Sequence, residues 1–290
     1  MRLRVVLAVF AVLTVLAVGG VYLLAHKIGS SLPLPVLVQE CTANAGGVAT
    51  LDPEQMANAA TIAAVGARRG VPERAVQIAL ATAAQESKLR NLDGGDRDSI
   101  GLFQQRPSQG WGTPEQISDP RYAANRFYTA LLRVKGWQQM PLATAAQHVQ
   151  RSADGSAYAV WETEAKVLSS ALFGDTGSAV ACVLTDQPAK RGAAAVQSVE
   201  QSLTLDWGKI DATGTSAPAG VQVTVDATRT GWRYAHWLVA HADDQGIKSV
   251  SYGTQRWTAK TGNWSKAPSA GTPANSMASV GSRVVAEVYD

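Results

Sequence analysis

An uncharged apolar run near the N-terminus places the strongest constraint on how this chain can fold. Residues 5–25 include no charged side chain, and Arg2 and Arg4 precede them while Lys27 follows. A helix of about 20 apolar residues can cross a bilayer, whereas a cleaved signal peptide has a shorter apolar region and a small-residue cleavage site. We therefore expect residues 1–27 to form an uncleaved signal anchor in the cell membrane. The N-terminal arginines predict a cytoplasmic N-terminus and a remainder outside the cell.

The chain has two cysteines, Cys41 and Cys182, and both follow the apolar run. Outside the cytoplasm, two cysteines most simply form one disulfide, which here would join the two ends of the segment between them. A pair of buried free thiols is the alternative.

Composition limits the classes of partner. The hydrophobic share of 46% and the charged share of 17% are typical of globular domains. The formal net charge of +3 comes without blocks of Lys and Arg, so no nucleic-acid partner is predicted. An anionic polymer of the cell surface is compatible with this charge.

Helix signals follow a short stalk expected over residues 28–50. Asp52 suits an N-cap, Pro53 suits the first helical position, and Gln55 completes a capping box, so a helix is expected from there to Gly70. Residues 91–112 are rich in Gly, Asp and Ser and are expected to form turns or a short hairpin. Further helices are expected over residues 72–89, 120–136, from 141 onward, and 156–172. The pattern predicts a mainly helical domain that is interrupted once by a small loop or hairpin lobe.

The composition changes after residue 174. Residues 175–197 are rich in small residues and are expected to form a linker. Beyond them, the sequence predicts an amphipathic helix over residues 232–245 and strands over 221–225, 247–252, 256–259 and 282–289. A small α/β module over residues 198–290 fits this order.

One acid is unusual for its place in an alanine-rich helix. On a helical wheel, Glu86 shares a face with Ala79 and Ala83, while Lys88 lies on the far side. Burial and the negative end of the helix dipole both favour the protonated carboxylic acid, which is the form that a general acid needs. The alternative is a structural ion pair with an arginine, for which the candidates are Arg90, Arg97 and Arg106.

Two motifs in this region are similar to those of a known family. Residues 85–87 read QES and residues 101–107 read GLFQQRP. Together they resemble the E-S and G-L-M-Q-x-x-P motifs of soluble lytic transglycosylases and goose-type lysozymes, with Phe103 in place of the usual Met. Residues 147–152 with Tyr158 resemble the distal helix of those domains, where a tyrosine faces the cleft. The resemblance covers residues 51–174.

The resemblance implies a mainly helical, lysozyme-like α+β fold over residues 51–174. It also implies cleavage of the β-1,4 bond between N-acetylmuramic acid and N-acetylglucosamine in peptidoglycan. Glu86 would protonate the glycosidic oxygen and then act as the base that gives a 1,6-anhydro product. Gln104 would hydrogen-bond the substrate, Ser87 would support the glutamate or a substrate acetamido group, and Tyr158 would line the cleft. The implied partners are peptidoglycan glycan strands, and no cofactor is implied.

Other residues of the loop lobe are further candidates. Trp111 lies between glycines and could stack on a sugar ring, with core filling as the alternative. A hydrolase would use a second carboxylate, for which Asp93, Asp96 and Asp98 are available. The alternative for these aspartates is turn formation.

The C-terminal segment 232–259 resembles a domain of actinobacterial extracellular proteins distantly related to zinc D,D-peptidases. His236 and His241 lie on different faces of the expected helix, so no metal site is predicted. We expect a wall-binding or positioning module. The leading hypothesis is therefore a membrane-anchored lytic transglycosylase or muramidase, and the alternative is a non-catalytic glycan-binding component of a wall-associated or secretion assembly.

Overall fold

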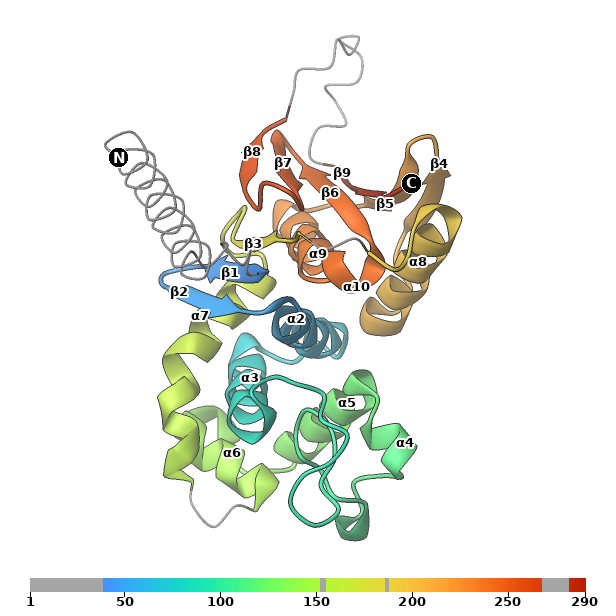
Figure 1. The fold of residues 1–290 in the computed structure, drawn as a ribbon. Helices are drawn as coiled ribbons and strands as arrows, with labels where there is room; N and C mark the ends of the chain where they lie inside the picture. The colour runs from blue at the N-terminus through green and yellow to red at the C-terminus, as the bar shows by residue number, and fades with distance from the viewer. Residues whose placement is uncertain (1–38, 152–154, 186–187, 268–281) are drawn as a thin grey trace, which may run out of the picture. The chain divides into compact units, whose positions relative to one another are not determined.

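The computed structural model describes residues 39–151, 155–185, 188–267 and 282–290, which form a mixed α+β fold (Figure 1). In these ranges no helix has both the length and the apolar character needed to cross a bilayer. The predicted anchor over residues 1–27 lies outside the described residues and stays a prediction.

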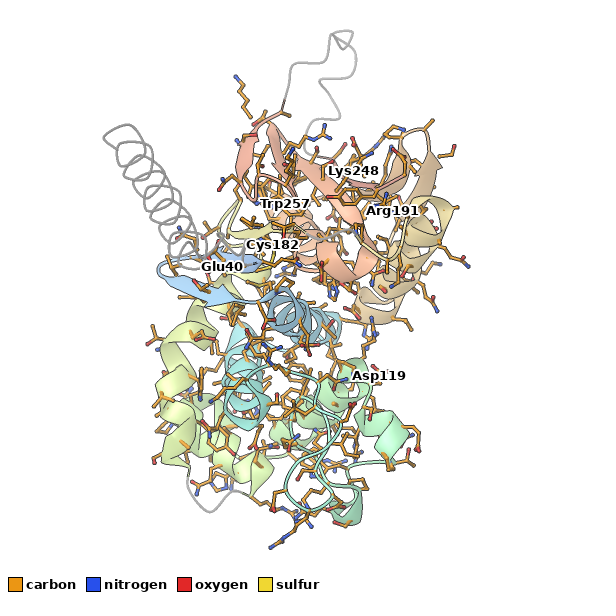
Figure 2. The ribbon with its side chains drawn as sticks, viewed as in Figure 1. Glu40, Asp119, Cys182, Arg191, Lys248 and Trp257 are labelled. Atoms are coloured by element: carbon orange, nitrogen blue, oxygen red, sulfur yellow. A yellow bond between two sulfur atoms is a disulfide. The ribbon has the colours of Figure 1, made fainter. Side chains whose placement is uncertain are left out.

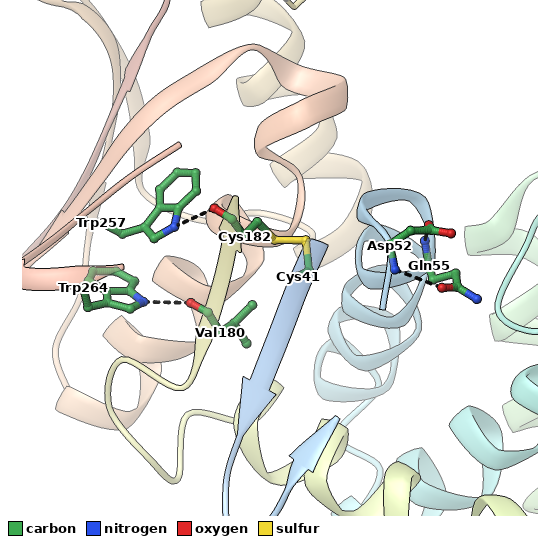
Figure 3. Close-up of a disulfide and its surroundings, with 7 residues drawn as sticks. All are labelled: Cys41, Asp52, Gln55, Val180, Cys182, Trp257 and Trp264. Atoms are coloured by element: carbon green, nitrogen blue, oxygen red, sulfur yellow. Dashed lines mark hydrogen bonds between the residues drawn. A yellow bond between two sulfur atoms is a disulfide. The ribbon is translucent and has the colours of Figure 1, made fainter. Parts of the chain in front are cut away.

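A small antiparallel sheet carries the disulfide. Its strands are β1 (Glu40–Asn44), β2 (Val48–Leu51) and β3 (Val180–Val183), in the order β2-β1-β3. The register sets Cys41 directly opposite Cys182, and the two form the predicted disulfide (Figure 3). Tryptophan side chains from the C-terminal part donate to β3: Trp257 Nε1 to the Cys182 carbonyl at 3.2 Å, and Trp264 Nε1 to the Val180 carbonyl at 2.7 Å.

This sheet occupies segments that the sequence indicates to be a stalk and a linker. β1 begins inside residues 28–50, and β3 lies inside residues 175–197. A strand whose partner is 141 residues away in the sequence leaves no local signal, because its stability comes from long-range pairing and from side-chain burial against neighbouring strands.

The helices of the first part follow the expected order, with shorter bounds. Asp52 caps α2 through the capping box with Gln55 shown in Figure 3, and Asp119 caps α5 (Figure 2). The elements are α2 (Pro53–Arg68), α3 (Glu73–Ser87), η1 (Pro107–Gln109), α4 (Pro114–Ile117), α5 (Pro120–Leu131), η2 (Trp137–Gln139), α6 (Leu142–Gln150), η3 (Ser156–Trp161) and α7 (Glu162–Leu172).

Helix α3 lies at the centre of this part and is buried on several sides, whereas the helical wheel predicts a single apolar face. Every residue from Ile78 to Ala84 is buried, including Leu80 and Ala84, which lie off the face that the wheel selects. Alanine side chains let neighbouring helices approach closely on all sides, and α3 packs against α2, α5, α6 and α7. Glu86 therefore lies where the fully buried stretch of α3 ends and the helix reaches the surface.

The C-terminal part is a six-stranded antiparallel sheet in the order β4-β5-β9-β6-β7-β8, packed against α8 and α9. The unpredicted α8 begins within the expected linker. The predicted 232–245 helix is two helices that meet at His241. The elements are α8 (Gly192–Trp207), β4 (Ala212–Ser216), β5 (Ala219–Thr224), α9 (Thr228–Ala240), α10 (Ala242–Gln245), β6 (Ile247–Tyr252), β7 (Gln255–Thr258), β8 (Trp264–Lys266) and β9 (Arg283–Val288).

A buried carboxylate joins the two parts. Asp206 on α8 is fully buried and accepts hydrogen bonds from Thr61 Oγ1 at 3.0 Å, from Trp237 Nε1 at 2.8 Å and from Arg121 Nε. These donors come from α2, α9 and α5. Residues 39–290 accordingly form one compact unit, and the predicted division into two domains stays a prediction.

Candidate functional site

The site begins at the last turn of α3, where Glu86 is half-buried. The hydroxyl of Tyr158, a buried residue of η3, donates to Glu86 Oε1 at 2.6 Å. No other hydrogen bond to this carboxylate comes from the residues that the structure describes. Two residues that the sequence assigns to separate motifs are therefore in direct contact.

The arginines considered as ion-pair partners of Glu86 pair with other acids. Arg90 binds Asp52 and Glu54, Arg97 lies beside Asp96, and Arg106 binds Asp98. A structural ion pair with one of these three arginines is thus not the reason for the acid at position 86.

Two consecutive left-handed residues turn the chain directly after Ser87. Lys88 has φ 56° and Leu89 has φ 58°, a conformation that costs a non-glycine residue about 1–2 kcal/mol. Side chains of α2 hold the turn: Gln55 Nε2 donates to the Lys88 carbonyl and Asn58 Nδ2 to the Leu89 carbonyl, each at 2.8 Å. These bonds and the burial of Leu89 fix where α3 ends, and with it the position of Glu86.

The turn formed by residues 101–105 docks on the same helix end. Ser87 is buried, and its hydroxyl lies 2.8 Å from the Leu102 carbonyl and 3.1 Å from the Ala83 carbonyl. Since a hydroxyl has one proton to donate, Ser87 serves as a tie between α3 and the 101–105 turn. Its predicted contact with substrate stays a prediction.

Gln104 is half-buried with φ 46°, and its Nε2 donates to the Gly101 carbonyl at 3.2 Å. Its amide lies directly against Gly95, because a Cβ added there would be 1.7 Å from Gln104 Oε1. Gly95 is thus required for the observed position of Gln104. The sequence suggests only turn chemistry for this glycine.

Two further glutamines position the 101–105 turn and were not identified from the sequence. Gln150 Nε2 on α6 donates to the Phe103 carbonyl at 2.7 Å. Gln105 is buried, and its Nε2 donates to the Ala123 carbonyl at 3.1 Å. Both bonds join the turn to helices distant in sequence, so no local pattern marks them.

The three aspartates differ in their surroundings. Asp98 accepts from Arg106 Nε at 2.7 Å and from the Ser108 backbone N–H at 2.8 Å, and these bonds, the one from Arg106 foremost, hold its pKa far below the usual value. This carboxylate therefore stays ionised and anchors the loop. Asp93 and Asp96 are exposed, and their role as a second carboxylate stays a prediction.

Trp161 and Trp111 also differ in their surroundings. Trp161 Nε1 donates to Gln85 Oε1 at 2.8 Å, and Lys88 Nζ lies 4.1 Å from the centroid of its ring, so this indole is beside the end of α3. Trp111 is half-buried, and its carbonyl accepts from Arg126 Nε at 3.0 Å. Stacking of Trp111 on a sugar stays a prediction.

The two C-terminal histidines have separate partners. Nδ1 of His236 donates to the Ala171 carbonyl at 2.8 Å and Nε2 accepts from the Ala179 N–H at 3.0 Å, while burial lowers the pKa of His236 to about 4. His241 lies 3.2 Å from Asp244 and 3.3 Å from Thr61. Across the described ranges, no three His, Cys, Asp or Glu side chains group in a way that could hold a metal ion.

No known family model matches this chain, and neither does any curated protein.

Proposed function

We propose that the protein cleaves the β-1,4 bond between N-acetylmuramic acid and N-acetylglucosamine in peptidoglycan by lytic transglycosylation, with Glu86 as the acid and base. The observation that carries the proposal is the 2.6 Å hydrogen bond from Tyr158 to Glu86 Oε1. It joins two of the three segments that resemble the family, at a helix end that also holds the third segment's 101–105 turn.

The geometry suits proton transfer by one carboxylate. Tyr158 holds Oε1, which leaves Oε2 to carry the proton that passes to the glycosidic oxygen as the bond to the muramoyl C1 breaks. The Glu86 carboxylate then accepts the proton of the muramoyl C6 hydroxyl, and that oxygen attacks C1 to close the 1,6-anhydro ring. Proton transfer of this kind contributes about 10²–10⁴-fold to a rate.

One carboxylate is sufficient for this reaction because the nucleophile, the muramoyl C6 hydroxyl, is part of the substrate. Asp98, the aspartate of the lobe with the most contacts, is held ionised by Arg106 and by the Ser108 backbone and has a role in anchoring the loop. Gln104 would hold the glycan from the 101–105 turn.

The test is digestion of purified cell wall by the wild-type protein and by Glu86→Gln, with products identified by mass spectrometry. Glu40→Gln is the matched control, since Glu40 is an exposed acid on β1 (Figure 2). We expect anhydromuropeptides from the wild type and the control only. Products with reducing ends would indicate a hydrolase, and an inactive wild type that still binds wall would indicate the non-catalytic alternative.

The same proposal places the protein at the outer face of the cell membrane, anchored by residues 1–27. The Cys41–Cys182 disulfide supports it, because disulfides persist in oxidising compartments. The six-stranded part would bind or position the wall. Fractionation of cells with protease accessibility tests the location: an anchored outer-face protein is degraded in intact spheroplasts and stays with membranes.

A further inference from the structure

A second candidate site lies beside the 101–105 turn, in a pocket of about 360 Å³. Glu86 does not line it. Its walls come from the segment after η1, from α5 and the residues that follow it, and from the end of α6. The lining residues that matter here are Trp111, Arg126, Arg133, His148, Gln150 and Arg151, and we call this site the basic pocket.

The basic pocket has a net positive charge. Among the residues that the structure describes, three arginines and a histidine line it, and no acidic residue does. Within the described part of the chain, no carboxylate lies within the 4.0 Å ion-pair distance of these three guanidinium groups. The C-terminus of α6 adds about half a negative charge, which the arginines exceed. Cations that have no carboxylate partner among the described residues suit an anionic ligand.

Arg126 is held in place without being neutralised. Its Nε donates to the Trp111 carbonyl at 3.0 Å and its Nη2 to the Gly110 carbonyl at 2.9 Å. A guanidinium group has five N–H donors, and these two bonds go to neutral acceptors. The half-buried Arg126 therefore presents a fixed positive charge, while the exposed Arg133 and Arg151 can close on a ligand.

We infer that the basic pocket binds a phosphate group carried on a saccharide. A phosphate monoester has about −1.5 to −2 charges, which balances several arginines better than the single charge of a carboxylate does. Guanidinium forks also match the geometry of phosphate oxygens. A volume of about 360 Å³ exceeds that of a phosphate group and leaves room for a sugar ring against the half-buried Trp111.

The basic pocket is joined to the proposed glycan-binding turn. Gln150 lines the pocket, and its Nε2 donates to the carbonyl of Phe103. Phe103 is the residue directly before Gln104. Phe103 in turn stacks on Phe127, the neighbour of Arg126, at a centroid distance of 4.8 Å. A phosphorylated sugar in the pocket would thus be adjacent to a glycan on the turn. The inference itself does not require that Glu86 be catalytic.

The test is calorimetric titration of the purified protein with glucose 6-phosphate, inorganic phosphate, glucuronate and glucose. We expect saturable binding of glucose 6-phosphate, binding of inorganic phosphate weaker by about tenfold, and no binding of glucose. In the Arg133→Gln/Arg151→Gln variant, the affinity for glucose 6-phosphate should fall by about 100-fold, since one charge-assisted hydrogen bond contributes about tenfold or more. The control is Lys209→Gln/Lys260→Gln, which removes the same charge at exposed positions outside the pocket.

Several results would overturn the inference. One is an equal loss of affinity in the lysine variant, which would indicate attraction by net charge alone. Another is equal binding of glucuronate and glucose 6-phosphate, which would contradict the phosphate assignment, and a third is no saturable binding of either phosphate. Glu86→Gln should bind glucose 6-phosphate as the wild type does. A failed wall digestion would therefore contradict the proposed function, whereas a failed titration would contradict the basic pocket as a phosphate site.

Discussion

Substitution of Gly95 by alanine tests the placement of Gln104 without altering Gln104 itself. The added Cβ would lie 1.7 Å from Gln104 Oε1, about half of a normal contact distance, so the amide must move away. The contact is with the end of a flexible side chain, and neither Gly94 nor Gly95 has a positive φ, so alanine is compatible with the backbone at both positions. Gly94→Ala is the matched control because its Cβ meets nothing within 4 Å.

The expected effect is on catalysis rather than on folding. If Gln104 donates one hydrogen bond to the glycan, its displacement removes about 0.5–1.5 kcal/mol, and kcat/KM falls about two- to tenfold. Gly94→Ala should stay within about twofold of the wild type, and thermal unfolding should show both variants as stable as the wild type or slightly more so.

A double-mutant cycle makes the test strict. Gln104→Ala alone should lower kcat/KM by as much as Gly95→Ala, and the combined variant should lower it no further, because both changes remove one interaction. Full activity of Gly95→Ala beside a clear loss in Gln104→Ala would refute the reasoning. An equal loss in Gly94→Ala and Gly95→Ala would also refute it, since it would point to the loop as a whole.

Three further predictions follow from particular contacts. Tyr158→Phe removes the bond to Glu86 Oε1 and should lower kcat about tenfold with little change in KM, measured by release of anhydromuropeptides; a change in KM alone would contradict the assigned role. Asn58→Ala leaves the Leu89 carbonyl without its donor and should lower the free energy of unfolding by about 1–2 kcal/mol in denaturant titrations, whereas Asn263→Ala on an exposed loop should not. His236 has a folded-state pKa of about 4 against an ordinary 6.5, so only the unfolded state binds its proton between these values. Stability should be complete above pH 6.5 and fall by up to about 3 kcal/mol towards pH 4, and His236→Gln should flatten this slope; an unchanged slope would show that another group titrates.

The sequence predicts the elements whose signals are local. The capping box of Asp52 and Gln55 is confirmed at the start of α2, as is the disulfide between Cys41 and Cys182. The end of α3 at Ser87 is harder to predict from the sequence. The left-handed residues after it are Lys88 and Leu89, where a glycine commonly ends a helix. Their conformation depends on amides of α2 that no local rule connects to them.

The rest depends on contacts across the chain. β1 and β3 are short strands that become recognisable only when paired, and α8 lacks a side-chain cap that would mark its start. No role for Asp206 is predicted from the sequence, yet this residue is fully buried and accepts hydrogen bonds from α2, α5 and α9. Burial of a charge is set by what packs over it, which the residue's neighbours in sequence do not specify.

The restraints on Glu86 converge from different elements. Tyr158 holds the carboxylate, Ser87 ties α3 to the 101–105 turn, and Gln55 with Asn58 holds the strained turn that ends the helix. Because these groups share one helix end, their effects should not be additive: loosening the turn moves Glu86 relative to Tyr158, so loss of Asn58 already weakens the bond that Tyr158→Phe removes. The Asn58→Ala/Tyr158→Phe variant should therefore lose less kcat than the product of the two single losses. If the losses simply multiply, the left-handed turn supports the fold and has no part in placing the acid.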